Sequence, residues 1–252
     1  MPAEKHTFAL NAYCSGHITG HDANPDIAAF PHNFVTEALA LGAGTEKSTN
    51  GFETPQYLFF NPEELLALPL MDEQLPIIRL LEVIEKADPE KTVLLKVNGP
   101  YSILASLVSP RLFYRWLAKN KSPVHTALER INAGLISYIR KAVSKGVAIL
   151  SIADPYANPD ILGEKHYCEF AAPYLVELLQ HIKAPGLVTH LCPHNSLILA
   201  KYGFLKSRAE PAEGESYIKR LIALTRQKDS ILLGHQCIYT GEPRELVLLD
   251  LL

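Results

Sequence analysis

Residues 146–155 read Gly-Val-Ala-Ile-Leu-Ser-Ile-Ala-Asp-Pro, and they directly follow a long amphipathic pattern that begins near Ser122. In that pattern apolar residues recur every three or four positions as far as Val143, as they do on one face of an α-helix. The run after Gly146 does not alternate with polar residues, which is typical of a strand buried on both faces of a parallel sheet. A helix that leads straight into a buried strand predicts an α/β fold.

Three further apolar runs alternate with helical patterns: residues 93–97, 186–192 and 231–233. A last helix is expected at residues 243–252. Repeated alternation predicts a parallel sheet, which an open doubly wound sheet and a closed barrel both satisfy. Polar residues follow several different strands and would meet at the mouth of a barrel. We therefore expect a TIM-type (β/α)8 barrel, with residues 1–252 as one domain and residues 1–30 as an irregular segment.

Length and composition limit the possible classes of protein. The chain has 252 residues, 48% of them hydrophobic, which suffices for one large core. The net charge of −3 gives no basic field for nucleic acid or for an anionic membrane surface. No apolar run has membrane-spanning length, and the four cysteines show no secreted disulfide pattern. We expect a cytoplasmic protein.

A metal site is predicted from His190-Leu191-Cys192 and the more distant Cys237. Alternate residues of a strand point to the same side, so the side chains of His190 and Cys192 would both point the same way at the end of a strand. Cys237 follows another apolar run and would arrive from a neighbouring strand. One imidazole and two thiolates suit zinc, and three protein ligands leave a fourth position open. The alternative is that these three side chains fill a core.

Four stretches carry a resemblance to a known family: Thr36-Glu37-Ala38 to Gly42-Ala43, Gly99-Pro100-Tyr101 to Ala105, Gly146 to Asp154-Pro155 with Pro173-Tyr174, and His190-x-Cys192 with Cys237. Together they resemble the uroporphyrinogen decarboxylase-like superfamily, and within it the methylcobamide:coenzyme M methyltransferases. The zinc signature is the most specific of the four. The resemblance covers most of the chain from about residue 30 onward.

The resemblance implies a barrel with zinc at its mouth, bound by His190, Cys192 and Cys237. A methyl group would pass from methylcobamide, carried on a small corrinoid protein, to a thiol-type acceptor such as coenzyme M. The chain departs from the family in length: about one strand-helix unit is missing between His190 and Cys237, so we expect an abridged barrel. Two alternatives stay open, a cofactor-free decarboxylase of the uroporphyrinogen type and a non-catalytic barrel that binds corrinoid or zinc.

Six further residues are candidates for the site: Glu37, Asn98, Tyr101, Asp154, Glu210 and His235. The resemblance suggests substrate or corrin contacts for Glu37, which could also simply compensate a helix dipole. Asn98 and Tyr101 either line the mouth or form a turn, and Asp154 either acts there or caps the next turn. Glu210, in a loop after a short strand, is the positional candidate for a displaceable fourth zinc ligand. His235 is a candidate hydrogen-bond partner of the metal thiolates.

Overall fold

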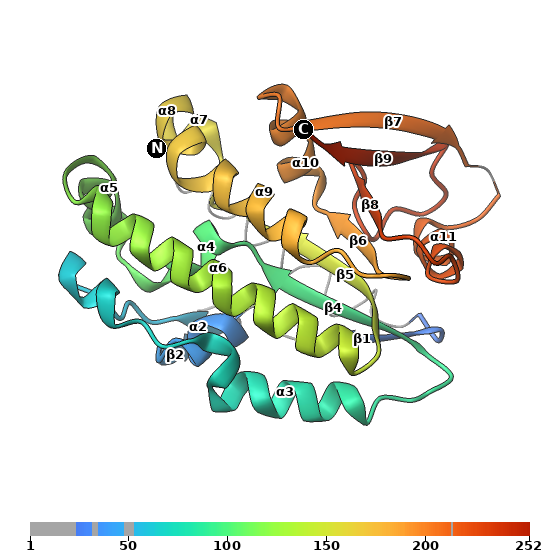
Figure 1. Cartoon of the computed structure of the whole chain (residues 1–252), viewed down its shortest axis with the longest axis horizontal. Coiled ribbons are helices and arrows are strands. Elements are labelled where there is room, and N and C mark those ends of the chain that lie inside the picture. The colour runs from blue at the N-terminus through green and yellow to red at the C-terminus, as the bar shows by residue number, and fades with distance from the viewer. Residues whose placement is uncertain (1–23, 32–34, 48–52, 213) are drawn as a thin grey trace.

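The structure is a computed structural model that describes residues 24–31, 35–47, 53–212 and 214–252. Seven strands form one sheet in the order β1-β4-β5-β6-β8-β9-β7 (Figure 1). Their bounds are β1 Ile27–Phe30, β4 Thr92–Asn98, β5 Val147–Ala153, β6 Val188–Leu191, β8 Ile231–Gly234, β9 Glu245–Leu251 and β7 Leu205–Pro211. The first five run parallel, and β9 and β7 are antiparallel to their neighbours. The predicted α/β fold with a mainly parallel sheet is confirmed.

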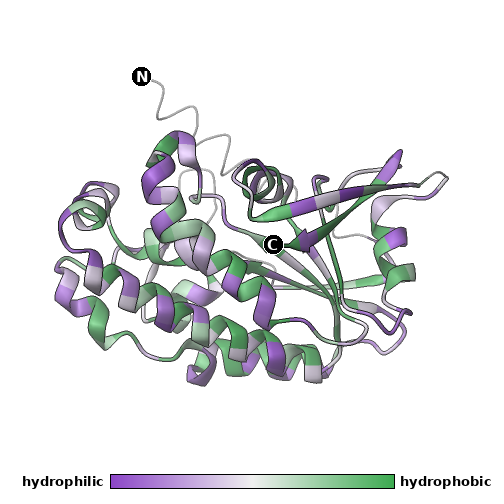
Figure 2. Ribbon diagram, turned by 45° about the horizontal axis from the view of Figure 1, so that its top comes forward, coloured by the Kyte–Doolittle hydropathy of each residue, from purple (hydrophilic) through white to green (hydrophobic). Residues whose placement is uncertain are grey.

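Helices cover one face of the sheet, with α3, α6 and α9 side by side in front of the strands in Figure 1. The elements of this layer are α2 Thr36–Ala40, α3 Leu75–Glu85, α4 Pro100–Leu107, α5 Pro110–Lys119, α6 Lys121–Ser144, α9 Ala172–His181 and α10 Pro193–Lys201. In Figure 2 the helices carry both hydrophobic and hydrophilic positions. The apolar side of α6, including Leu128 and Leu135, is fully buried in the core that also contains Leu95 and Leu150 of the sheet.

The short elements connect this layer. They are the hairpin β2 Thr45–Lys47 and β3 Glu53–Pro55, the 3-10 turns η1 Pro62–Ala67 and η2 Met71–Glu73, the helices α7 Pro159–Leu162 and α8 Glu164–His166, and the π-helical turn η3 Tyr167–Ala171. The π turn leads directly into α9. It gives the helix an extra residue per turn at that point, which turns the side chain of Glu169 towards α6.

A second core lies on the opposite face of the sheet. Here α11 Tyr217–Leu224 and the segment after β8 pack on the strands. Leu94 of β4, Val188 of β6 and Leu233 of β8 contribute side chains to this core. Because strand side chains alternate between faces, Leu94 belongs to this core while Leu95 belongs to the helix-covered one. We call this second face the inner face of the sheet.

The sheet differs from the prediction at both ends. Residues 27–30, expected within an irregular segment, form β1; the rest of that segment lies largely outside the described residues. Residues 245–251, expected as a helix, form β9. In the sheet of the described residues β1 and β7 are the two edges, and no ladder joins them, so the predicted closure into a barrel is not seen there.

The strand β9 has a clear physical cause. Its sequence, Glu-Leu-Val-Leu-Leu-Asp-Leu, is a short apolar run whose periodicity does not distinguish a helix from a strand. As a strand it pairs along its whole length with β7 and in part with β8. Backbone groups that β7 and β8 would otherwise leave unpaired are thereby satisfied. Long-range pairing therefore overrides the local pattern.

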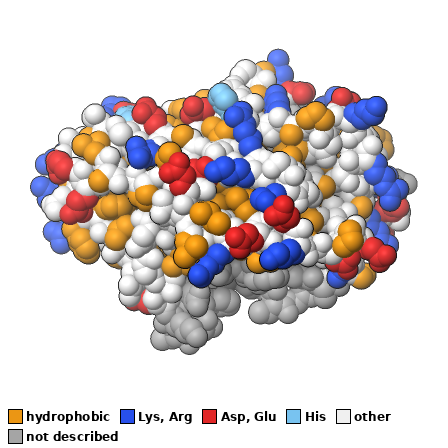
Figure 3. All heavy atoms as spheres, turned by 60° about the horizontal axis from the view of Figure 1, so that its bottom comes forward, with side chains coloured by type: hydrophobic (Ala, Val, Ile, Leu, Met, Phe, Trp, Pro, Cys, Tyr) orange, Lys and Arg blue, Asp and Glu red, His pale blue; other side chains and the backbone are white. Residues whose placement is uncertain are grey.

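The surface carries mixed charge. Figure 3 shows one face, on which Lys and Arg side chains are interspersed with Asp and Glu and with hydrophobic side chains. Neighbouring charges of opposite sign partly cancel one another's field, and salt at about 0.1 M screens what remains beyond about 10 Å. Among the described residues, none of the helices combines the length and the apolarity that crossing a membrane requires.

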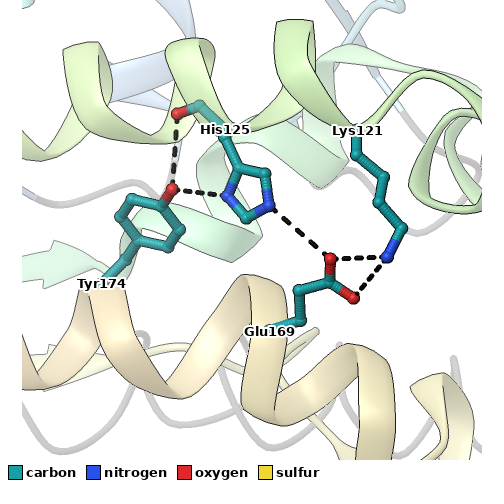
Figure 4. A network of polar contacts seen from close by, with 4 residues as sticks. All are labelled: Lys121, His125, Glu169 and Tyr174. Carbon is teal, nitrogen blue, oxygen red and sulfur yellow. Dashed lines mark hydrogen bonds and ion pairs between the residues drawn. The ribbon is translucent and has the colours of Figure 1, made fainter.

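A polar network joins α6 to η3 and α9 on the outside of the helix layer (Figure 4). Lys121 Nζ contacts both carboxylate oxygens of Glu169, at 2.5 and 2.7 Å. His125 Nδ1 lies 2.7 Å from the Tyr174 hydroxyl, and its Nε2 lies 3.8 Å from Glu169. The His125 ring is also stacked on Phe170, 4.5 Å between centroids. The network thus combines a part-exposed ion pair with a more sheltered hydrogen bond.

These two parts should respond differently to salt. We expect Tyr174→Phe to lower the free energy of unfolding by about 1 kcal/mol at any salt concentration, because it removes a hydrogen bond made by a hydroxyl group and no ion pair. Lys121→Met should cost less than about 1 kcal/mol, and 1 M NaCl should abolish the difference from wild type. Urea denaturation at low and high salt measures both, with Tyr114→Phe as the control for an exposed tyrosine. A salt-dependent effect of Tyr174→Phe would contradict this account.

Candidate functional site

His190 lies on the inner face of the sheet, between Ser151 of β5 and Leu233 of β8. Its ring is buried, with Nδ1 3.0 Å from the Ser151 hydroxyl and Nε2 2.9 Å from the carbonyl oxygen of Gln236. A carbonyl only accepts, so Nε2 carries the proton and Nδ1 accepts from Ser151. Burial lowers the pKa of His190 to about 4. The imidazole is therefore neutral at physiological pH.

The two cysteines follow neighbouring parallel strands. Cys192 comes directly after β6 and immediately precedes α10, and its N–H donates to the carbonyl of Ile152. Cys237 lies three residues beyond β8, in a turn closed by a hydrogen bond from Thr240 N to its carbonyl oxygen. Both are half-buried. The Gln236 carbonyl that accepts from His190 is bonded to the nitrogen of Cys237, so the Cys237 backbone follows directly after this contact.

The residue types present suit zinc in their chemistry, but in the described residues their side chains are not arranged as a metal site. Two thiols and one neutral imidazole at adjacent strand ends are a zinc donor set. Both nitrogens of the His190 ring have protein partners, so a metal ion on Nε2 would have to replace the Gln236 carbonyl. Correspondingly, in the described part of the chain no three His, Cys, Asp or Glu side chains are arranged as a metal cluster.

Glu37 and Asn98 form a buried pair at the carboxyl end of β4. Glu37 Oε1 accepts from the backbone N–H of Asn98 at 3.3 Å, and Oε2 accepts from its side-chain amide at 3.1 Å. The Glu37 side chain is 1% exposed. Burial, opposed by these hydrogen bonds, raises its pKa to about 7. On the side of β4 that faces β1, the ladder of the described residues ends opposite Leu95, and Glu37 binds the Asn98 N–H beyond it.

Asp154 stabilises the start of α4 from the end of β5. Its Oδ1 accepts from the N–H of Ser102 at 2.7 Å, and its own N–H and C=O are both bonded to the side-chain amide of Asn195. Burial raises the pKa of Asp154 to about 6. Gly99 makes this approach possible, since a Cβ there would lie 2.4 Å from the Asp154 side chain. Asp154 thus caps α4, because its carboxylate accepts from a backbone N–H in the first turn of that helix.

The remaining candidates are placed differently. Tyr101 is buried on α4, and its ring packs against Phe113 in the helix-side core, so the structure does not bring it to the cysteines. Glu210 was expected in a loop but lies on β7, with its carboxylate 2.5 Å from Arg208. The strand is longer than predicted because β9 pairs with all of it. The structure does not bring Glu210 into contact with the predicted ligands.

His235 lies between β8 and Cys237 in an unusual conformation. Its φ of 63° is in the left-handed region, which non-glycine residues adopt rarely. Its N–H donates to the Ser196 hydroxyl at 2.8 Å, and among the described residues its Nε2 is buried without a partner. Burial lowers the pKa of His235. One residue further along the chain, the Gln236 carbonyl accepts from Nε2 of His190.

Sequence reasoning missed three residues at this site: Ser151, Tyr217 and Gln236. Ser151 had a signal, because it is the single polar residue inside an apolar strand. Tyr217 had none, although its ring packs edge-on against His190 with centroids 5.9 Å apart. Its hydroxyl is buried without a partner in the described part of the chain, and burial, followed by the charge of nearby Cys237, raises its pKa.

Comparison with known proteins finds methyltransferases and a decarboxylase among the relatives. The family model for uroporphyrinogen decarboxylase (URO-D) matches residues 16–208. The methylcobamide:CoM methyltransferase MtaA of Methanosarcina barkeri is 26% identical over 142 residues, 55% of this chain and 40% of that protein. The methylated-thiol–coenzyme M methyltransferase of Methanosarcina mazei is 21% identical over 145 residues, 56% of this chain and 39% of that protein.

A solved structure has the same fold. A methyltransferase from Methanosarcina mazei superposes with a TM-score of 0.57 at 19% sequence identity, covering 79% of this chain and 60% of that one. The chain thus spans about two fifths of the length of the curated relatives it matches. At this identity the structural likeness concerns the fold alone.

The raised pKa of Glu37 predicts a pH dependence of stability. Between its unfolded value of 4.5 and its folded value of about 7, the folded chain holds a proton that the unfolded chain has lost. The free energy of unfolding therefore falls as pH rises through this window, by roughly 3 kcal/mol in total. Glu37→Gln should flatten this fall in urea denaturation between pH 4.5 and 8. Glu63→Gln, an exposed change of the same kind, should run parallel to wild type; a parallel curve for Glu37→Gln would refute the assignment.

The close approach at Gly99 gives a second prediction. Gly99→Ala places a methyl group 2.4 Å from Asp154, so one of the two loops must shift. We expect a loss of about 1–3 kcal/mol in the free energy of unfolding, as for other overpacked sites. Gly241→Ala, where a Cβ meets nothing within 4 Å, should change it little. Equal thermal unfolding midpoints for the two variants would be inconsistent with a tight Gly99–Asp154 contact.

Proposed function

The chain belongs to the uroporphyrinogen decarboxylase family, as its sequence motifs predicted, and we propose that it is a methyltransferase that moves a methyl group from a protein-bound methylcobamide to a thiol. The observation that carries the proposal is the donor set of His190, Cys192 and Cys237 at the ends of the neighbouring parallel strands β6 and β8. The relatives named as methylcobamide:CoM and methylated-thiol–coenzyme M methyltransferases support the same reaction class.

His190, Cys192 and Cys237 would hold a zinc ion. Nε2 of His190 would bind the metal and give up its hydrogen bond to the Gln236 carbonyl. When bound, zinc lowers the pKa of the acceptor thiol, so that a thiolate is present at neutral pH. Ser151 donates to Nδ1 of His190 and thereby fixes the tautomer and the ring orientation, as outer-shell partners of metal-binding histidines do. Burial of the ring keeps it neutral and free of competing protonation.

The transfer itself is a displacement at carbon. A lone pair of the acceptor sulfur forms the S–C bond, while the electron pair of the Co–C bond stays on cobalt, which passes from Co(III) to Co(I). The thiol proton is released to solvent. The chain's contribution is to position the sulfur opposite the methyl group and to exclude water from it. A small corrinoid protein would present the methylcobamide at the carboxyl ends of the strands.

We further propose that the sheet is an abridged form of the family's barrel. The five parallel strands β1, β4, β5, β6 and β8 would correspond to consecutive strands of the (β/α)8 arrangement. The antiparallel pair β9 and β7 would stand where further strand-helix units lie in longer members.

Metal analysis tests the proposal directly. We expect the purified protein to contain about one zinc per chain. Cys192→Ser and Cys237→Ser should each lose most of it, while Cys168→Ser, an exposed cysteine on η3, should keep it. With methylcobalamin and a thiol, only wild type and Cys168→Ser should form the methyl thioether. Zinc retained in both site variants, or no thioether from the zinc-loaded wild type with any thiol, would disprove this function.

A further inference from the structure

A cavity of about 300 Å³ lies on the inner face of the sheet, between the first halves of β1 and β4 and the segment that follows β8. This volume is at the lower end of the range of roughly 300–1,000 Å³ found for pockets that bind small molecules. On the sheet side the wall is formed by Ile27 and Leu94. On the other side it is formed by Ile218 of α11 and by Ile238 and Tyr239.

The cavity is separate from the predicted zinc ligands. Cys192 and Cys237 follow the carboxyl ends of β6 and β8, whereas Ile27 is the first residue of β1 and Leu94 lies near the start of β4. Neither cysteine, and not His190 either, is among the described residues that line the cavity. A molecule in the cavity would therefore occupy a second site and would not be the methyl acceptor.

The walls are held in place by contacts of their own. A hydrogen bond of 2.8 Å from Tyr217 N to Gly241 O joins the start of α11 to the segment after β8. Ile238 is buried in the inner core together with Leu94. Lys96 Nζ lies 5.6 Å from the centroid of the Tyr239 ring, a cation–π contact that orients this ring. A pocket that is already ordered loses little conformational freedom when it binds a ligand.

The residues around the cavity indicate which chemistry it can accept. Most of the wall is aliphatic, and none of the described residues that line it is charged. An ionic group would lose its hydration there without gaining a partner of opposite charge in the wall. One polar group has an unusual position: Ser216 is the N-cap residue of α11, yet its side chain makes no capping bond to that helix. Its hydroxyl can bond to a polar group of a bound molecule instead.

We propose that the cavity binds a neutral molecule of two aromatic rings that carries one hydroxyl or N–H group. An apolar cavity of about 150 Å³ holds benzene, so twice this volume has room for two fused rings. The rings lie between Leu94 and Ile218, next to the ring of Tyr239, and the polar group bonds to Ser216. This site needs neither a metal nor a corrinoid and is additional to the proposed methyl transfer.

Titration calorimetry with three probes tests the proposal. We expect 2-naphthol to bind saturably, a single molecule per chain, and at least tenfold more tightly than phenol or naphthalene-2-sulfonate. Phenol fills only part of the cavity, and the sulfonate would bury a charge without a partner. The absence of saturable 2-naphthol binding, or equal or tighter binding of either other probe, overturns the proposal.

Variants of the wall locate the bound molecule. Ile218→Trp fills the cavity and should weaken 2-naphthol binding at least tenfold, whereas Ala223→Trp, at an exposed position on the same helix, should bind as wild type does. If Ile218→Trp does not fold, the smaller Ile218→Phe takes its place with the same expectation. Ser216→Ala should weaken binding about threefold to tenfold, because it removes one hydrogen bond. Wild-type affinity in the folded Ile218 variant, or in Ser216→Ala, overturns the proposed binding mode.

Two further measurements separate this site from the proposed reaction, since neither uses methylcobalamin or a thiol. Treatment of the protein with a metal chelator should leave 2-naphthol binding unchanged, because the cavity is lined by none of the predicted ligands. Bound 2-naphthol should slow amide hydrogen exchange in residues 238–241, which form one wall. Loss of binding after chelation, or protection elsewhere in the chain but not in residues 238–241, contradicts the assignment.

Discussion

At the carboxyl ends of the parallel strands, side chains from adjacent loops and helices bind backbone groups that lie beyond the ladders of the described residues. The Asn98 N–H lies beyond the end of β1 and donates to Glu37. One amide, that of Asn195, accepts from the N–H of Asp154 and donates to its C=O. A buried backbone group without a partner costs about 1–3 kcal/mol, so each of these bonds constrains two loops at once. Hydrogen bonds between side chains and backbone therefore fix the segments after these strands relative to one another.

The same constraint positions the imidazole. The His190 ring connects the Ser151 hydroxyl of β5 with the Gln236 carbonyl beyond β8, so it spans three adjacent strands of the sheet. The Gln236 carbonyl reaches it only because the preceding residue, His235, adopts a positive φ and is held there by Ser196. Strain at one residue thus supports the geometry at another, in the way expected of functional sites. The ring is ordered before any ligand arrives.

Local patterns determined most of what could be predicted. The buried strand after Gly146 and the amphipathic helix before it have the structure that their local sequence patterns predict. The position of His190 and Cys192 at a strand end was predicted from a similar apolar run. Glu210 could not be placed, because its strand exists only through pairing with β9, and that pairing depends on residues far along the chain. Tyr217 could not be found for the same reason, since nothing near it in the sequence indicates a contact with His190.

The antiparallel end of the sheet also changes what covers its inner face. A parallel barrel covers its inner face with strands from the opposite side, whereas here α11 and the segment after Cys237 cover the inner face of β1 and β4. Ile238 of that segment is buried with Leu94 and Tyr217 in the inner core. The segment is tied at one end by the bond from His190 to the Gln236 carbonyl and at the other by the bond from Tyr217 N to Gly241 O. Its path therefore depends on His190 and on the start of α11 together.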